Sequence, residues 1–200
     1  MRMSPVPPTL TPRRSATWRL MARAPRALRG VNVGGTGLIR MTDLRRIFER
    51  AGADEVSTYI ASGNVLFSAS ARDLPGIRRR AQAALTRVLG QRAATAWRTA
   101  RELQAIVETD PFARVKGGKE VKRYVLFFSG KPRIVRPTPW FHDKEGCEVF
   151  AMLGLNAFVA SYQLPTGWWG FPNNMVEAEL GVVSTARTWS TVAKLAALVE

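Results

Sequence analysis

A glycine-rich segment that leads into a predicted helix is the part of this sequence best suited to bind an anion. It reads Leu28-Arg29-Gly30-Val31-Asn32-Val33-Gly34-Gly35. Glycines leave little side-chain bulk, so backbone N–H groups can approach a ligand closely, and the next helix directs its unpaired N–H groups and positive dipole end towards the same segment. We therefore expect Arg29, Asn32, Gly34 and Gly35 to bind a phosphate or carboxylate. If Arg29 instead pairs with an acid, the glycines only turn the chain.

Two further places offer polar groups of the same kind. Ser62 and Asn64 lie at the predicted tip of a hairpin, where they either contribute to a ligand site or form a plain turn. Thr185 and Arg187 precede the last predicted helix, where they either bind an anion or cap the helix. The glycine-rich segment lacks both the Gly-Lys-Ser/Thr of a P-loop and the third glycine of a dinucleotide fingerprint. The sequence therefore favours an anion but names no reaction.

Catalytic and metal-binding patterns are weak. The one histidine, His142, lies near Asp143 and Glu145, but a metal site needs more ligands of this kind, so we expect a solvated loop and no metal. The sequence has no Gly-x-Ser-x-Gly motif, and we expect no cofactor. Cys147 is the one cysteine; it predicts a structural thiol in a reducing compartment, without disulfides.

The composition is strongly basic, with a formal charge of +15 over 200 residues. Such a charge is typical of proteins that bind nucleic acid or another anionic partner, although the excess of arginine and alanine is also a bias that genome composition produces. No apolar run is long enough to span a membrane. We expect a cytoplasmic protein, a monomer or homodimer without a membrane partner, that meets a phosphate-bearing ligand or nucleic acid.

The order of predicted elements indicates an α+β fold. Residues 1–23, with four prolines and no apolar period, predict a disordered head, and the true start is either Met1 or Met21. Residues 24–110 follow the order strand, helix, strand, strand, helix, strand, which is the ferredoxin-like (split βαβ) arrangement with an antiparallel sheet. Residues 111–200 predict a second α+β subdomain.

Local signals predict where several elements begin and end. Thr42 and Asn173 are the expected N-caps of two helices, Thr99 and Glu102 form a capping box, and Gly63-Asn64 is expected as a two-residue hairpin turn. In the second half, we expect strands at Tyr124 to Phe128, at Ile134 and Val135, and at Cys147 to Leu153, with a last helix from about Trp189. Arg78-Arg79-Arg80 predicts an exposed helix face. Trp168-Trp169 either stacks on bases or on an apolar partner, or packs as core or as a lid over the second sheet. A separate hypothesis is that Trp168-Trp169 or the exposed sheet face mediates self-association.

Several motifs together resemble one protein family. They are Leu28 to Gly35, Met41 with Leu44, Thr58-Tyr59-Ile60-Ala61-Ser62-Gly63-Asn64-Val65-Leu66-Phe67, Asp110-Pro111-Phe112 and Thr185-Ala186-Arg187-Thr188-Trp189-Ser190-Thr191. In this order they resemble the bacterial domain of unknown function 1697 family. The resemblance covers nearly everything from Leu28 to Glu200 and implies two tandem ferredoxin-like domains, but no established activity. Two asparagines usual in the family are replaced here by Thr188 and Ser190.

Two functional hypotheses follow. The first is a non-catalytic module that binds an anion, a nucleotide or nucleic acid through Arg29, Asn32, Gly34 and Gly35, with Asn64 nearby. The alternative is an enzyme that acts on a phosphorylated or carboxylated small molecule and uses Arg29 and Arg187 as electrostatic clamps. The sequence shows no general base for the second hypothesis, and it leaves the ligand unidentified.

Overall fold

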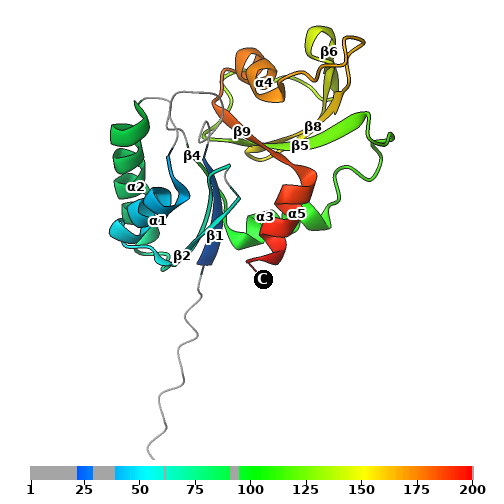
Figure 1. Ribbon diagram of the computed structural model, residues 1–200. Helices are drawn as coiled ribbons and strands as arrows, with labels where there is room; N and C mark the ends of the chain where they lie inside the picture. The colour runs from blue at the N-terminus through cyan, green and yellow to red at the C-terminus, as the bar shows by residue number, and fades with distance from the viewer. Residues whose placement is uncertain (1–21, 29–38, 61, 91–94, 200) are drawn as a thin grey trace, which may run out of the picture.

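A computed structural model describes residues 22–28, 39–60, 62–90 and 95–199. Within these ranges the chain forms two antiparallel sheets and five α-helices (Figure 1). None of these helices has both the length and the apolar composition needed to cross a bilayer. The helices are α1 (Met41–Arg50), α2 (Leu74–Leu89), α3 (Ala100–Glu108), α4 (Pro172–Leu180) and α5 (Trp189–Ala197). The strands are β1 (Ala22–Leu28), β2 (Asp54–Tyr59), β3 (Asn64–Ala69), β4 (Thr95–Trp97), β5 (Val121–Phe128), β6 (Trp140–His142), β7 (Cys147–Leu153), β8 (Asn156–Tyr162) and β9 (Ser184–Thr188).

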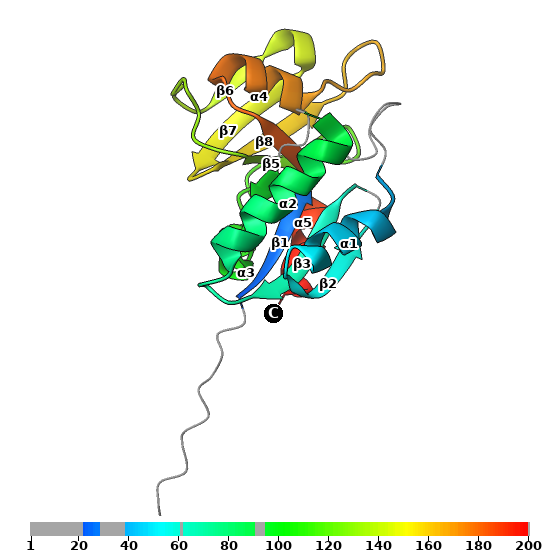
Figure 2. The ribbon, with the colours of Figure 1, turned by 90° about the vertical axis from the view of Figure 1, so that its left-hand side faces the viewer.

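The first sheet has the strand order β2-β3-β1-β4, and helices α1 and α2 cover one of its faces (Figure 2). The apolar residues of the two helices recur at intervals of four, so they share one face of each helix. Leu44 and Phe48 of α1, together with Ile77, Ala81 and Leu85 of α2, have no exposed surface and pack in one cluster with residues of β3. β1 begins at Ala22, while residues 1–21, nearly all of the predicted disordered head, lie outside the described ranges.

The second sheet has the strand order β6-β7-β8-β5-β9 and carries α4 on its outer face (Figure 1). Met175, Val176 and Leu180 of α4 are buried in a cluster that includes Val149 and Val159 of the sheet. A short 3-10 helix, η2 (Asp143–Glu145), separates β6 from β7.

Helices α3 and α5 lie side by side in the angle between the two sheets (Figure 1). Leu103 and Ile106 of α3 and Leu195 of α5 belong to a buried cluster that also contains Leu66 of the first sheet and Phe158 of the second. A single apolar core therefore joins both sheets through this helix pair. Because each sheet is covered on both faces, the two halves of the chain share buried surface that neither would cover alone.

Two expectations, one about the second half and one about the hairpin, are wrong in detail. Ile134 and Val135 form no strand; their side chains are 54% and 86% exposed, and the extra strand is β6. The Ile134 N–H, like that of Arg133, bonds to the Leu180 carbonyl and not to a sheet. The hairpin turn lies between Tyr59 and Asn64, which are paired, so Asn64 is the first residue of β3 and not a turn residue.

Two predicted helix caps are also wrong. Arg40 is the N-cap of α1, and Thr42 lies inside the first turn. Phe171 is the N-cap of α4, where Asn173 instead donates from its side-chain amide to the Ser184 hydroxyl at 3.0 Å. The capping box of α3 is confirmed, because the Glu102 carboxylate accepts from the Thr99 N–H at 2.6 Å and the Glu102 N–H donates to the Thr99 hydroxyl at 3.2 Å.

The confirmed cap at Thr99 and the wrong cap at Thr42 lead to a pair of stability predictions. Replacing Thr99 by alanine removes the acceptor for the Glu102 N–H, and we expect the free energy of unfolding to fall by about 1 kcal/mol. Replacing Thr42 by alanine removes no cap and raises helix propensity, so we expect no loss. Urea unfolding followed by circular dichroism measures both changes; equal losses in the two variants would contradict this assignment.

Candidate functional site

The structure separates the eight predicted ligand-binding residues into two groups. Arg29, Asn32, Gly34 and Gly35 lie outside the described residues. The other four, Ser62, Asn64, Thr185 and Arg187, are described and lie in one cluster.

The guanidinium of Arg187 is the centre of this cluster. Its Nε donates to the Asn64 side-chain oxygen at 2.6 Å, and one Nη donates to the Ser62 carbonyl at 2.7 Å. The other Nη donates to the Thr185 hydroxyl at 2.9 Å and to the Ala186 carbonyl at 2.7 Å. The arginine on β9 of the second sheet is thus bonded to the β2–β3 turn of the first, more than 120 residues earlier in the chain.

Local backbone geometry aims Asn64 at this arginine. Positive φ angles at Ile60 (51°) and Gly63 (80°) turn the chain between β2 and β3. The Asn64 side-chain amide is fully buried, and its nitrogen donates to the Tyr59 carbonyl at 3.0 Å and the Ser62 hydroxyl at 3.1 Å. Because the nitrogen is held by the turn, the side-chain oxygen faces Arg187 as an acceptor.

Burial governs the electrostatics of the cluster. Removal from water lowers the pKa of Arg187 to about 10, so the guanidinium still carries its charge at neutral pH. The acceptors just named are carbonyl, amide and hydroxyl oxygens, which stabilise the charge without neutralising it. The cluster therefore keeps a positive charge at the end of the first sheet where β1 also ends, since Ala27 of β1 is paired with Asn64.

A second buried arginine repeats the arrangement, and sequence analysis missed it. Arg98, which follows β4, donates from Nε to the Asn156 side-chain oxygen at 2.9 Å and from Nη to the Trp97 carbonyl at 2.8 Å. Its other Nη bonds to the Leu155 carbonyl. Asn156 is the first residue of β8, and its side-chain nitrogen donates to the Leu153 carbonyl at the end of β7 at 3.0 Å. Burial lowers the pKa of Arg98 to about 10.

The two clusters are reciprocal. Each arginine stands at the end of the last strand of one half and bonds to an asparagine that opens the second-to-last strand of the other half. Each also donates to the carbonyl of the residue before it and is followed by a threonine that caps a helix, Thr99 for α3 and Thr188 for α5. The repeated Arg-Thr pair before a helix was the one sequence signal that could have identified Arg98.

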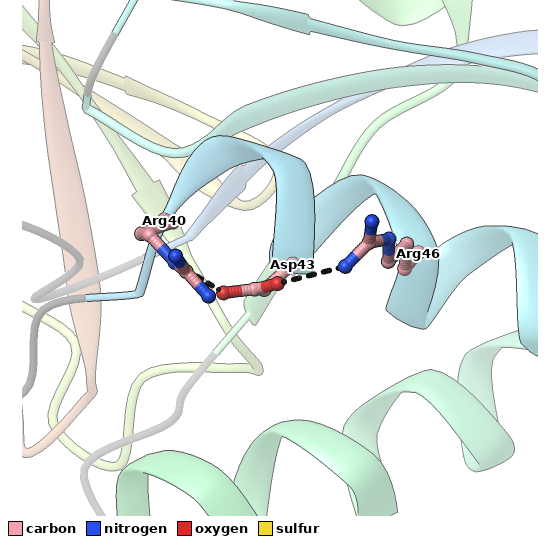
Figure 3. A network of polar contacts seen from close by, with 3 residues as sticks. All are labelled: Arg40, Asp43 and Arg46. Carbon is pink, nitrogen blue, oxygen red and sulfur yellow. Dashed lines mark hydrogen bonds and ion pairs between the residues drawn. The ribbon is translucent and has the colours of Figure 1, made fainter.

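The N-terminus of α1 carries a separate charged network (Figure 3). Arg40 and Arg46 lie on either side of the Asp43 carboxylate, with nitrogen–oxygen distances of 2.8 Å and 3.5 Å. The side chains of the two arginines are 83% and 67% exposed. Two cations thus share one carboxylate at the positive end of the helix. The Arg40 side chain accepts no hydrogen bond from the first N–H groups of α1.

In the run Arg78-Arg79-Arg80, Arg79 and Arg80 are exposed as predicted and Arg78 is half-buried, but two of the three side chains contact the protein. Nε and one Nη of Arg80 donate to the Ala51 carbonyl at 3.0 Å and 2.7 Å, which caps the C-terminus of α1. The Arg78 guanidinium lies 5.3 Å from the centre of the Trp97 ring. Arg79 is exposed.

The remaining reactive side chains have structural roles. No group of three or more metal-ligating side chains occurs among the described residues. The Nδ1 atom of His142 accepts the Glu145 N–H at 3.3 Å and so caps η2. Cys147 is fully buried, and burial raises the pKa of its thiol, which favours the neutral thiol over the nucleophilic thiolate.

A hollow of about 180 Å³ lies at the other end of β2 and β3 from Asn64. It is lined by Glu55, Ser57 and Ser68 on one side and by Leu198 and Val199, after α5, on the other. The Ser68 hydroxyl donates to the Glu55 carboxylate at 2.5 Å. None of the four predicted ligand-binding residues that the structure describes lines it.

Comparison with known proteins identifies the family. The model of a protein family described as "Protein of unknown function (DUF1697)" matches residues 21–157. The chain belongs to this family. A search of curated proteins found no match. Among solved structures, the chain resembles the conserved bacterial protein SP0830 from Streptococcus pneumoniae, with a TM-score of 0.60 and 16% sequence identity. The match covers 90% of this chain and 99% of that one, so this family member shares its fold with SP0830 over nearly the whole length.

The reciprocal pairs give a prediction about stability. Replacing Asn64 or Asn156 by alanine leaves the Nε–H of a buried arginine without its acceptor, and we expect each change to lower the free energy of unfolding by about 1–3 kcal/mol. In double-mutant cycles, Asn64→Ala should couple to Arg187→Ala and be additive with Arg98→Ala, because only the first pair shares a hydrogen bond. Urea unfolding measures these values; additivity in both cycles would contradict the assigned pairing.

Proposed function

We propose that this protein is a non-catalytic binding module for a phosphate-bearing anion, a nucleotide or nucleic acid, at the end of the first sheet. The observation that supports it is the cluster of Ser62, Asn64, Thr185 and Arg187, which holds a buried positive charge beside the end of β1. The chain leaves β1 at Leu28 and continues directly into the segment from Arg29 to Gly35.

In this proposal the residues of the Arg187 cluster position the site and attract the anion, whereas Arg29, Gly34 and Gly35 contact it. Arg187 fixes the β2–β3 turn and contributes an attractive potential, because its donors are engaged by the protein. Arg29 then contacts the anion through a charge-assisted hydrogen bond, and Gly34 and Gly35 offer backbone N–H groups. The N-terminus of α1, with Arg40 beside it, adds a favourable dipole.

A binding role fits the chemistry of the cluster better than a catalytic one. Its side chains are a guanidinium, an amide and two hydroxyls, and none of these exchanges a proton readily near neutral pH. They can fix the position of an anion and balance its charge. Cys147, unpaired and buried, suits a reducing compartment, so we include a cytoplasmic location in the proposal.

We also propose that the two halves are tandem ferredoxin-like units. The strand order β2-β3-β1-β4 with two helices on one face supports this for the first half. The order β7-β8-β5-β9 with α4 supports it for the second, where the segment between β5 and β7, including β6, stands in place of a first helix. The reciprocal Arg98–Asn156 and Arg187–Asn64 contacts add to this support.

The proposal predicts that Arg29 is required for anion binding. Titration with nucleotides and short RNA or DNA at two salt concentrations, followed by calorimetry, should show binding that weakens by about tenfold or more in Arg29→Ala, since a hydrogen bond between charged groups is lost. Arg79→Ala removes an equal charge from an exposed helix face and serves as the control. Unchanged binding in Arg29→Ala, or an equal loss in the control, would refute the proposed site.

A further inference from the structure

The segment between β8 and α4 presents aromatic rings to solvent. Trp168 is 75% exposed and Phe171 is 66% exposed. Among the tryptophans that the structure describes, Trp140 is buried, and Trp97, Trp169 and Trp189 are half-buried. Transfer of an aromatic ring from water into an apolar contact is favourable, so two exposed aromatic rings three residues apart are typical of a contact surface.

Hydrogen bonds hold this segment in one conformation. The Leu164 N–H donates to the Trp168 carbonyl at 2.9 Å, and the Gly167 N–H donates to the Leu164 carbonyl at 2.8 Å. The Gln163 side chain donates to the Gly167 carbonyl at 2.9 Å. The exposed indole ring is therefore carried on a turn that is closed by hydrogen bonds. Binding a ligand there costs little conformational entropy, because the turn is already ordered.

The same segment is fixed to the body of the second half at Glu145. The Phe171 N–H donates to the Glu145 carboxylate at 2.7 Å. A Cβ atom built on Gly170 would lie 1.9 Å from the Glu145 carbonyl oxygen, so only glycine fits at this close approach. Both exposed rings are thus attached to a rigid support.

Positive charge adjoins these rings. The Lys122 ammonium lies 4.0 Å from the centre of the Trp169 ring, and the Glu120 carbonyl accepts the Gln163 N–H at 3.2 Å, so the start of β5 contacts the aromatic segment. Residues 114–123 contain five basic side chains and one acidic one. Lys116, Lys119 and Lys122 are exposed. A polyanion that contacts this segment would meet Lys122 beside Trp169 and would also lie near the Glu145 carboxylate, which accepts the Phe171 N–H.

We propose that Trp168 and Phe171 form a stacking surface for the bases of a single-stranded nucleic acid, whose phosphates pair with Lys119 and Lys122. Aromatic rings stack on any base, and lysines bind the backbone without reading sequence, so the expected ligand is a single strand with little sequence preference. This inference does not depend on the cluster around Arg187, because none of its residues belongs to that cluster.

Fluorescence anisotropy with a labelled single strand of about 12 nucleotides tests the inference on the full chain. We expect the double variant Trp168→Ala/Phe171→Ala to bind about tenfold or more weakly, because stacking on two rings is lost. Phe141→Ala, which removes a 48% exposed ring from β6, is the matched control and should bind like the unmodified chain. A duplex of the same sequence should bind more weakly than the single strand, since its bases are already stacked.

The lysine contribution has its own signature. Lys122→Ala should reduce the slope of log affinity against log salt by about 0.7, the value for one phosphate contact on a single strand.

Three results would overturn the inference: no binding of the single strand at low salt, equal affinity of Trp168→Ala/Phe171→Ala and Phe141→Ala, or equal affinity for duplex. A loss in Arg29→Ala alone would assign nucleic-acid binding to the glycine-rich segment instead. Light scattering that shows self-association lost in the double variant would identify a second copy of the chain as the occupant.

Discussion

Two buried guanidinium–amide contacts hold this molecule in its observed arrangement. Arg187 bonds to Asn64 and Arg98 bonds to Asn156, and in each pair the partners come from different halves of the chain. A buried cation is tolerated only if its donors are satisfied, so each arginine restricts the position of the opposite turn. The geometry of one half is therefore coupled to the geometry of the other.

The apolar core reinforces this coupling. α3 and α5 lie between the sheets and share one buried cluster with both of them. Phe112, on the connection from α3 to β5, has ring contacts with Phe150, Phe158 and Trp189 at centroid distances of 5.2 to 6.1 Å. Hydrophobic packing has little directional preference, whereas the two arginine clusters fix direction and register. Together they explain how two sheets with separate helices form one molecule.

The two regions proposed to bind ligands lie where strands end or where the chain turns. The cluster around Arg187 stands where β1 ends, and the exposed rings of Trp168 and Phe171 stand on the turn before α4. Loops carried by a stable scaffold are the usual location of binding residues, since the scaffold provides precision and the loop provides access. The basic composition of the chain is consistent with this, but several arginines are already engaged, as Arg80 is with the Ala51 carbonyl. Net charge alone therefore overstates the surface available to an anion.

The sequence by itself determined the family, the α+β class and most helices. Leu44 and Phe48, or Ile77, Ala81 and Leu85, reveal a buried helix face because helix periodicity is a local property. The Thr99–Glu102 capping box is equally local. Tertiary structure alone decided that Asn64 is a strand residue bonded to a buried arginine, that Arg98 bonds to Asn156, and that Ile134 and Val135 remain in an exposed loop. These outcomes depend on partners far away in the chain, such as Arg187 for Asn64 and Leu180 for Ile134, and no local pattern of residues encodes which distant acceptor or donor will be nearby.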